Sequence, residues 1–295
     1  MRLLIAGWQG QIAQALMEIA PARSDVTACA IGRPALNICE VGSVERALGH
    51  IDPDVIINTA AYTAVDTAET EPARAFALNR DGARMLAGVA ARRGIPIIHL
   101  STDYVFNGRS TAAYAETAPA DPATVYGRSK LEGETAVQAS NPKHIILRTA
   151  WVHSPYGRNF VTTIVERARA GAPLRVVSDR HGSPTYAPHL AEAILTLARC
   201  VTKTSEIEPA WGIYHLAGSG RASWYDVARQ ALLSSGDLGP ALDRLEAIRT
   251  QEHQSGAAKP VNSELDCRKL ERNFEIRLPA WQAGVAECVK RLTAR

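Results

Sequence analysis

The stretch Leu3-Leu4-Ile5-Ala6-Gly7-Trp8-Gln9-Gly10-Gln11-Ile12-Ala13 decides the fold that the sequence predicts. An apolar run indicates a strand, a glycine turn follows it, and a helical pattern begins at Gln11. Gly7 and Gly10 let the backbone turn tightly and approach a pyrophosphate, to which a helix N-terminus offers free N–H groups and a partial positive charge. Ala13 is small enough to let the helix pack closely on the strand. A glycine-rich turn without a ligand is the alternative, because this motif alone is weakly specific.

Apolar runs alternate with helical patterns through the first half of the chain. The predicted strands are Leu3–Ala6, Val26–Ile31, Val55–Asn58, Pro96–Leu100 and Ile145–Arg148. The predicted helices are Gln11–Ile19, Val44–Leu48, Glu71–Arg93 and a helix that begins near Tyr126 and includes Leu131–Ala139. The strands lack polar alternation, as is typical of parallel strands covered on both faces. We therefore expect an α/β fold in which residues 1–150 form a Rossmann-like, doubly wound parallel sheet.

The second half has a different pattern, because proline and glycine interrupt it more often. Leu174–Val177 is predicted as one more strand of the sheet, and Leu190–Arg199 as a helix. A further helix is predicted over Trp224–Leu233, with Ser223 as its N-cap. We expect residues 151–295 to form mainly a smaller C-terminal α/β substrate domain, with segments that return to the Rossmann sheet.

Composition excludes several classes of function. The chain has 295 residues, of which 46% are hydrophobic and 21% charged, as in ordinary globular proteins. A net charge of +3 is too small to indicate nucleic acid or a membrane surface as the partner. No apolar stretch approaches the length of a membrane span, and the N-terminal apolar run is too short for a signal peptide. The 5 cysteines are scattered without CxxC spacing, which favours reduced thiols, no metal site and a cytoplasmic location.

A tyrosine and a lysine four residues apart form a second motif, Tyr126-Gly127-Arg128-Ser129-Lys130. On a helix this spacing places both side chains on one face. The ammonium of Lys130 is expected to lower the pKa of Tyr126 from its ordinary value near ~10 and to bond the nicotinamide ribose. Tyr126 then donates a proton to a carbonyl oxygen as a hydride reaches the carbon. A solvated helix face with an aromatic ring and a charge is the alternative.

Two further segments lie where strands are predicted to end. In Ser101-Thr102-Asp103-Tyr104, the Thr102 hydroxyl is suited to hydrogen-bond the same carbonyl oxygen and share its developing charge. The alternative for Thr102 is a hydroxyl that caps the strand end. Trp151 follows another predicted strand, where it is suited to pack against a sugar face. A buried core position is the alternative for Trp151.

The end of the second predicted strand bears on the choice of cofactor. NAD enzymes often carry a carboxylate there to bind the ribose 2′-hydroxyl. Here the strand ends in Ile31-Gly32-Arg33, and a guanidinium at residue 33 suits a 2′-phosphate. We therefore expect NADPH as the cofactor, with a solvated loop arginine as the alternative for Arg33. Asn58-Thr59-Ala60-Ala61 ends the strand that should flank the cofactor, and its small residues let the ligand approach, with plain packing as the alternative.

These motifs together resemble a known family. They are Gly7–Gln11, Asn58–Asp66, Ser101–Phe106, Tyr126–Lys130, Arg148–Val152, Gly182–Tyr186 and Gly212–Leu216. The chain resembles the extended short-chain dehydrogenase/reductases over nearly its whole length, and most closely the dTDP-4-dehydrorhamnose reductase family. The strings Ser-Thr-Asp-Tyr-Val-Phe and Thr-Ala-Val-Asp are quite specific within that superfamily.

The resemblance implies an oxidoreductase of dTDP-rhamnose and polysaccharide biosynthesis. Such an enzyme reduces the 4-keto group of dTDP-4-dehydro-L-rhamnose to dTDP-L-rhamnose with NADPH or NADH. The expected catalytic residues are Thr102, Tyr126 and Lys130. The expected cofactor-binding residues are Gly7, Gly10, Gln11, Ile12, Arg33, Asn37, Ala60, Ala61, Tyr62, Thr63, Tyr126 and Lys130. The expected substrate-binding residues are Thr102, Asp103, Tyr104 and Trp151.

Three positions depart from the family pattern. Ala13 replaces a third glycine, Asn37 stands where an aspartate near the adenine is common, and Glu264 stands where a basic residue is common. The segment around Glu264 is expected to lie near the nucleotide, so this departure concerns the identity of the sugar nucleotide. Some members of the family use magnesium at a dimer contact. The sequence has no ligand cluster that carries magnesium over to this chain, and it leaves a homodimer open.

Two other functions remain open at the level of the sequence. The first is a sister reductase that acts on another 4-keto-6-deoxyhexose nucleotide or gives the opposite C4 stereochemistry. The second is a non-catalytic, NADP-binding regulatory subunit like that of methionine adenosyltransferase. The intact Thr102, Tyr126 and Lys130 argue against the second function.

Overall fold

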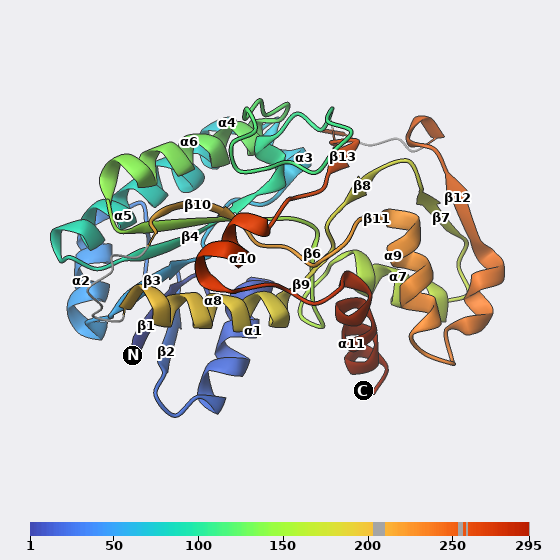
Figure 1. The fold of residues 1–295 in the computed structure, drawn as a ribbon, viewed down its shortest axis with the longest axis horizontal. Coiled ribbons are helices and arrows are strands. Elements are labelled where there is room, and N and C mark those ends of the chain that lie inside the picture. Colours follow the sequence, from blue (N-terminus) through green and yellow to red (C-terminus); the bar gives the residue numbers. More distant parts are fainter. Residues whose placement is uncertain (203–209, 253–255, 258, 295) are drawn as a thin grey trace.

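The computed structural model describes residues 1–202, 210–252, 256–257 and 259–294. Its centre is a six-stranded sheet with the order β10-β5-β4-β3-β1-β2, and each pairing in it is parallel (Figure 1). The strands are β1 Arg2–Ala6, β2 Thr27–Ile31, β3 Val55–Asn58, β4 Ile97–Thr102, β5 His144–Thr149 and β10 Gly212–His215. The predicted α/β class with a doubly wound parallel sheet is confirmed.

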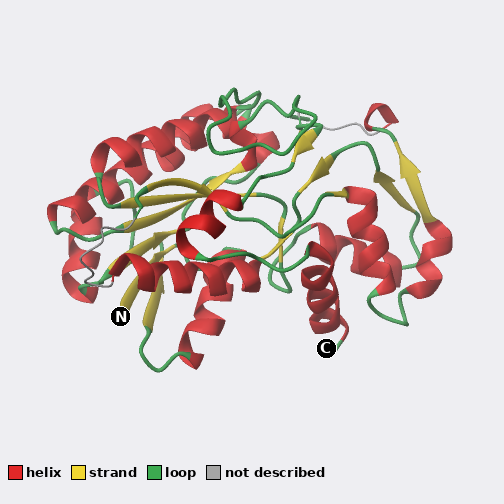
Figure 2. Cartoon of the chain, viewed as in Figure 1, coloured by secondary structure: helices red, strands yellow, loops and turns green. Residues whose placement is uncertain are grey.

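Helices cover both faces of this sheet, as Figure 2 shows by colour. Successive strand side chains point to opposite faces. Leu3 therefore packs in the layer that includes α1 and α8, while Leu4 packs in the layer that includes α2, α5 and α6. The bounds of these helices are α1 Gln11–Ile19, α8 Ala187–Thr202, α2 Val41–Ile51, α5 Ala83–Arg92 and α6 Val125–Ser140. Burial on both faces explains why the strands are continuous apolar runs.

The C-terminal half is built from small sheets and short helices. Its strands are β6 Val152–His153, β7 Leu174–Val177, β8 His181–Gly182, β9 Thr185–Tyr186, β11 Ala222–Ser223, β12 Leu245–Ile248 and β13 Asn262–Ser263. Its helices are α7 Phe160–Arg169, α9 Trp224–Leu233, α10 Arg268–Phe274 and α11 Trp281–Thr293. A second hydrophobic cluster joins α7, α9 and α11. The predicted N-cap of α9 is confirmed, since Ser223 and Asp226 bond each other's backbone N–H groups.

The prediction that Leu174–Val177 belongs to the central sheet is wrong. This strand, β7, pairs in parallel with β12 in a separate two-stranded sheet. A run of four residues does not reveal which sheet contains it, because its pattern is the same in either place. Several predicted bounds also shift. The most relevant one is β4, which continues through Thr102 and so includes the hydroxyl residues that were expected to follow it.

The long helix predicted over residues 71–93 is interrupted. After α3 (Val65–Ala68), α4 (Pro72–Phe76) leads into a π-helical turn at Ala77–Gly82, and α5 follows. The turn lies against α6, where a Cβ added at Gly133 would come within 2.2 Å of the Asn79 carbonyl oxygen. Glycine at residue 133 therefore permits this close approach of the two helices.

The order of the strands creates the place where a ligand can bind. The chain proceeds outward from β1 to β2 on one side and from β3 to β10 on the other. In doubly wound sheets, ligands bind at the carboxyl ends of the strands where the order reverses. Here those ends belong to β1 and β3, and the C-terminal half faces the same edge of the sheet (Figure 1).

Candidate active site

The glycine turn after β1 has the geometry of an anion-binding loop. Gly7 has φ of +103°, and a Cβ there would come within 2.7 Å of the Thr59 hydroxyl oxygen, so only glycine fits. Gly10 is the N-cap of α1, and no side chain caps this helix end. The space around Gly10 is open, since a Cβ built there meets no atom within 4 Å. The first N–H groups of α1 are thus available to a phosphate, which is the fit that a dinucleotide requires.

One cavity of about 580 Å³ gathers most of the predicted site residues. The predicted residues that line it are Gly10, Gln11, Ile12, Ala61, Thr63, Thr102, Asp103, Tyr104, Tyr126, Lys130 and Trp151. They come from the carboxyl ends of the strands, from α1 and from the start of α6. The structure therefore brings together the glycine loop and the three expected catalytic residues, although their roles stay predictions.

Tyr126 lies at the start of α6 and is 9% exposed. Thr124 caps this helix by accepting the N–H of Gly127, which fixes where the helix begins. Burial raises the pKa of Tyr126 to about 12, an effect that a hydrogen bond with Thr102 opposes. The Thr102 hydroxyl also accepts the N–H of Tyr104 and donates to a carboxylate oxygen of Asp103 at 3.0 Å. Thr102 is thus both the capping hydroxyl of the alternative interpretation and a neighbour of Tyr126.

Lys130 stands one turn after Tyr126 but differs from the expectation in what its ammonium contacts. The Nζ atom donates to the Leu100 carbonyl at 2.7 Å and lies 3.4 Å from Nε2 of His99. Burial lowers the pKa of Lys130 to about 8, although the charge of Glu134 opposes this. The expected lowering of the Tyr126 pKa is therefore wrong for this structure, because burial dominates the phenol.

A buried ion pair beneath the cavity was not predicted from the sequence. Glu134 accepts two hydrogen bonds from Arg148, at 2.6 and 2.9 Å, and another from the Ser101 hydroxyl. The side chains of Glu134 and Arg148 are 1% and 4% exposed. Removing one partner of such a pair costs about 3–5 kcal/mol. Two signals were present in the sequence: Glu134 continues the spacing of Tyr126 and Lys130, and Arg148 is a charge inside an apolar strand.

A second cavity of about 320 Å³ continues from the glycine turn along the end of β2. Arg33, Asn37 and Ala60 line it. Arg33 is exposed, which leaves its guanidinium accessible to a ligand. The Asn37 amide is used within its own turn, where it donates to Glu40 at 2.6 Å and accepts the Cys39 N–H. Asn37 therefore has fewer free hydrogen-bonding groups for an adenine than its position in the sequence suggests.

Tyr62 is the one predicted cofactor residue that lines neither of these two cavities. Its hydroxyl donates to Glu71 at 2.8 Å, and its backbone N–H donates to the Asn79 side chain at 2.7 Å. Its side chain thus holds the loop against α4. The neighbouring Ala61 and Thr63 remain at the cavity wall.

On the substrate side, Trp151 has a partner that the sequence did not reveal. Its ring stacks on Trp224 with centroids 3.6 Å apart, and its indole N–H donates to Ser263 at 3.0 Å. Trp151 adopts φ of +47°, a strained conformation for a bulky residue. Sugar packing and core packing are therefore not exclusive here, because one face of the ring is used by Trp224 while the residue still lines the cavity.

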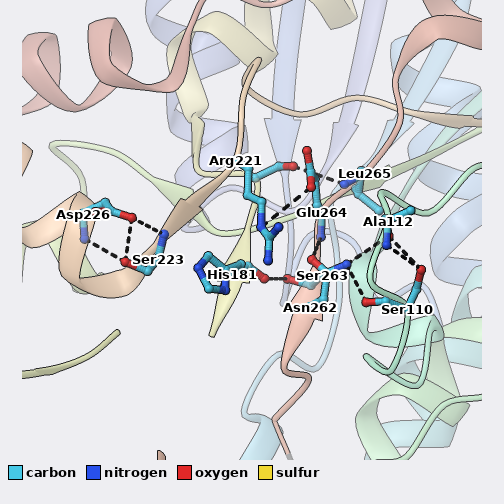
Figure 3. Close-up of polar contacts among 11 residues, drawn as sticks. Ser110, Ala112, His181, Arg221, Ser223, Asp226, Asn262, Ser263, Glu264 and Leu265 are labelled. Carbon is cyan, nitrogen blue, oxygen red and sulfur yellow. Dashed lines mark hydrogen bonds and ion pairs between the residues drawn. The ribbon is translucent and has the colours of Figure 1, made fainter. Parts of the chain in front are cut away.

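Figure 3 shows the polar contacts of the segment around Glu264, which directly follows β13. Asn262 donates to the carbonyls of Ser110 and Ala112, both at 3.0 Å, which ties this segment to a loop of the N-terminal half. Glu264 lies 3.9 Å from the guanidinium of Arg221. The position where the family commonly has a basic residue thus holds a carboxylate, and this carboxylate pairs with Arg221, the residue that precedes β11.

A further cavity of about 410 Å³ adjoins the first, and Tyr104 lines both. Its walls combine the apolar side chains of Phe160, Ile164, Leu174, Val176, Val177 and Trp224 with the cations Arg167, Arg175, Arg180 and Lys259. Arg180 is only 7% exposed and its Nε has no partner among the described residues. None of these cations was singled out from the sequence, because single arginines and lysines outside a recognised motif have no local signature of binding.

Comparisons with known proteins agree with this geometry. The family described as RmlD substrate binding domain matches residues 1–294. The chain is 45% identical over 289 residues to the dTDP-4-dehydrorhamnose reductase of Sinorhizobium fredii, covering 98% of this chain and 97% of that protein. It is 40% identical over 233 residues to a probable dTDP-4,6-dihydroxy-2-methyloxan-3-one 4-ketoreductase of Streptomyces antibioticus, covering 78% and 76%. A solved structure of dTDP-4-dehydrorhamnose reductase from Bacillus anthracis in complex with NADP has a TM-score of 0.87 at 30% identity, covering 98% and 99%.

The chain therefore belongs to the dTDP-4-dehydrorhamnose reductase family of NAD(P)H-dependent oxidoreductases. The resemblance inferred from its motifs is confirmed. Across the described residues, no helix combines the length and the apolar character needed to span a membrane. In the same part of the chain, no group of three or more His, Cys, Asp or Glu side chains is arranged to hold a metal ion.

Proposed function

We propose that this protein uses NADPH to reduce the 4-keto group of dTDP-4-dehydro-L-rhamnose, giving dTDP-L-rhamnose. The observation that carries the proposal is that Thr102, Tyr126 and Lys130 line the same cavity as the glycine loop. A hydride donor held by that loop and a proton donor on α6 would then face one space. The names of the relatives supply the substrate, because the cavity alone does not distinguish one keto sugar from another.

The residues present fit a dinucleotide phosphate. Gly10 leaves open space at the uncapped start of α1, and Arg33 stands exposed at the far end of the adjoining cavity. A guanidinium binds a 2′-phosphate through charge-assisted hydrogen bonds, whereas the diol of NADH offers it no anion. When bound, NADPH supplies the hydride to the carbonyl carbon. The Bacillus anthracis relative was solved with NADP, which supports this choice.

The protein's own residues then handle the proton. Tyr126 is the general acid, and its high pKa keeps it protonated until the carbonyl oxygen gains charge. Thr102 donates a second hydrogen bond to that oxygen, by turning its hydroxyl away from Asp103. Lys130 lies one turn further along α6 and lines the same cavity, where its free N–H groups are suited to the nicotinamide ribose.

The cavity of about 410 Å³ that Tyr104 also lines is suited to the nucleotide part of the substrate. A diphosphate carries negative charge, and Arg167, Arg175, Arg180 and Lys259 line this space. The buried Arg180 is the strongest single support, because its Nε atom has no partner among the described residues and a buried polar atom without a partner is costly unless a ligand bonds it. Tyr104 borders both cavities, so one molecule could extend from the diphosphate site to Tyr126.

The test is an assay of freshly prepared dTDP-4-dehydro-L-rhamnose with NADPH, followed by NMR of the product. We expect NADPH absorbance to fall and the product to be dTDP-L-rhamnose. A protein that binds NADPH tightly but consumes none with this substrate would contradict the proposal, and one that also consumes none with other keto sugar nucleotides would be the non-catalytic cofactor-binding subunit.

A second candidate is a reductase of another 4-keto-6-deoxyhexose nucleotide. It is supported by the 40% identity to the probable ketoreductase of Streptomyces antibioticus. Glu264 adds to it, because the carboxylate paired with Arg221 departs from the family pattern near the expected nucleotide. Kinetics with a panel of keto sugar nucleotides would separate the two candidates. A higher kcat/KM for another sugar, or the opposite C4 configuration in the product, would favour the second.

A further inference from the structure

Three buried polar side chains form a row beneath the cavity. Asn58 ends β3, His99 lies beside it on β4, and Lys130 approaches from α6. They are 1%, 1% and 2% exposed. The Asn58 amide nitrogen is 3.0 Å from Nδ1 of His99, and Nε2 of the same ring is 3.4 Å from Nζ of Lys130. The row therefore connects the loop after β3 to Lys130 through both nitrogens of one imidazole.

The orientation of the Asn58 amide is fixed by the backbone. The N–H of Ala60 is 3.1 Å from Oδ1 of Asn58, and a backbone N–H can only donate. The atom that it meets must therefore be the amide oxygen. The NH2 group of Asn58 consequently faces His99, and this group also can only donate. Nδ1 of His99 must then be the acceptor and carry no proton.

This requirement selects the tautomer of His99. A neutral imidazole carries one proton, so with Nδ1 unprotonated the proton is on Nε2 and points toward Lys130. An ammonium has three donors and no acceptor, so it would oppose that N–H. A neutral amine has a lone pair that accepts it and can still donate to the Leu100 carbonyl at 2.7 Å. The hydrogen-bond pattern thus favours the uncharged form of Lys130.

The other charged groups near Lys130 do not reverse this preference. Glu134 favours the ammonium, but both of its oxygens are already bonded to Arg148. Tyr126 precedes Lys130 by one turn and its high pKa keeps it neutral. Asp103 lies beyond the end of β4, where burial raises its pKa to about 6. Burial holds the pKa of His99 well below its ordinary value, which keeps the ring neutral as the argument requires, and a charged Lys130 lowers that pKa further.

We propose that Asn58 fixes the tautomer of His99, and that His99 thereby lowers the proton affinity of Lys130. Both are positioning residues, and their relevance to catalysis rests on the function proposed above. Lys130 is then held near the point at which it gains or loses a proton, instead of being a permanent cation. Reversing the tautomer would turn the lone pair of Nε2 toward Lys130 and make it a stable ammonium.

The first experiment reads the tautomer directly, by NMR of the full chain labelled with ¹⁵N-histidine. His99→Phe assigns the ring signals of His99. We expect a neutral ring with its proton on Nε2 across the range from about pH 6 to about pH 9. A ring protonated on Nδ1, or an imidazolium at about pH 7, would overturn the proposal. This measurement uses neither substrate nor turnover, so it is independent of the proposed function.

The second experiment titrates Lys130 in protein labelled with ¹³C-lysine, with Lys130→Met for assignment. In the wild type we expect its signal to titrate near pH 8. Asn58→Asp supplies an acceptor to Nδ1 and should reverse the tautomer, raising the Lys130 titration by ~1 pH unit or more. The new carboxylate also acts through its charge, so Asn58→Asp is repeated in the His99→Phe background.

The comparison of the two backgrounds decides the mechanism. If Asn58 acts through the ring, the upward shift should be clearly smaller without His99. An equal shift in both backgrounds would show an effect of charge alone and would contradict the proposal. If Asn58→Asp does not fold, the tautomer of the wild-type ring still decides. Where turnover is measurable, the pH dependence of kcat should move with the Lys130 titration.

Discussion

The sheet edge that bears the expected catalytic residues and the C-terminal half are built in different ways. Tyr126, Lys130 and Glu134 stand one turn apart on a single helix that packs against β4. The contacts of the C-terminal half join residues far apart along the chain, as between Trp151 and Ser263, which are 112 positions apart. Local structure thus places the groups proposed to do the chemistry, whereas tertiary contacts shape the space proposed for the substrate. Substitutions in the two regions should therefore separate kcat from KM.

The largest effect is expected for Tyr126→Phe. The change removes one hydroxyl and keeps the ring, so the fold and NADPH binding should survive. General acid catalysis contributes about 10²- to 10⁴-fold, and kcat should fall by that order. Steady-state kinetics and NADPH titration measure both. Tyr214→Phe is the matched control, because that hydroxyl donates to the Ala210 carbonyl, away from the cavity. Wild-type turnover by Tyr126→Phe would contradict the mechanism.

The second prediction concerns Asp103, which is 3% exposed with one carboxylate oxygen unpartnered. Burial raises its pKa from 3.8 to about 6, although hydrogen bonds from Ser263 and Thr102 act in the opposite direction and lower the pKa. Since the pKa is raised on folding, the stability linked to this group is full below about pH 4 and is lost as the pH rises through about 6. Asp103→Asn should then stabilise the protein by up to about 3 kcal/mol at about pH 7.5, with no gain at about pH 4.

Urea denaturation at both pH values measures this effect. Asp179→Asn is the control with the opposite sign. Burial would raise the pKa of Asp179, but hydrogen bonds from Thr250 outweigh it and the pKa is lowered. Its replacement should therefore reduce stability at about pH 7.5. A loss of stability in Asp103→Asn at that pH would show that the charge of Asp103 is compensated.

The third prediction tests whether the cofactor end of the molecule recognises the 2′-phosphate through Arg33. A hydrogen bond to a charged group contributes roughly 1.5–3 kcal/mol, so Arg33→Ala should lower the NADPH/NADH preference by about 10- to 100-fold. The ratio of kcat/KM values for the two cofactors measures it. Arg92→Ala is the control, because Arg92 is exposed and pairs with Glu45 outside the cavities. An unchanged ratio in Arg33→Ala would contradict this role and favour the alternative, in which Arg33 is a solvated loop residue.

The smallest effect is expected in the C-terminal half. Trp224→Leu removes the ring that stacks on Trp151, and such aromatic pairs contribute about 0.5–1.5 kcal/mol. The KM for the sugar nucleotide should rise about 2- to 10-fold, with NADPH binding unchanged. Trp211→Leu is the control, since Trp211 packs against the core of the sheet. A fall in kcat larger than the rise in KM would remove the distinction between the two regions.

The sequence predicted the central sheet and the helix of Tyr126 and Lys130 because both have local signatures. Parallel strands buried on both faces are apolar runs, and the spacing of Tyr126 and Lys130 fixes one face of a helix. It did not predict where the Lys130 ammonium points, because the Leu100 carbonyl lies on another element. It also missed Trp224, whose stacking on Trp151 depends on tertiary contacts alone.

The division of the chain at residue 150 stays a prediction, as do the roles of the site residues. Asn37 illustrates the limit of motif comparison, since its amide is used by Glu40 and Cys39 of its own turn. A motif predicts position along the chain, but the contacts of a side chain depend on what packs around it.

The return of the chain to the central sheet bears on how the protein can be divided in the laboratory. β10 pairs with β5 along one edge, and Leu190 and Ile194 of α8 cover a face that also contains Leu3. A fragment ending at residue 150 would leave that strand edge and that apolar face exposed to water. Unpaired edges and apolar faces promote aggregation. Expression of residues 1–150 alone should therefore yield insoluble material, and adding the remaining residues as a separate chain should rescue it.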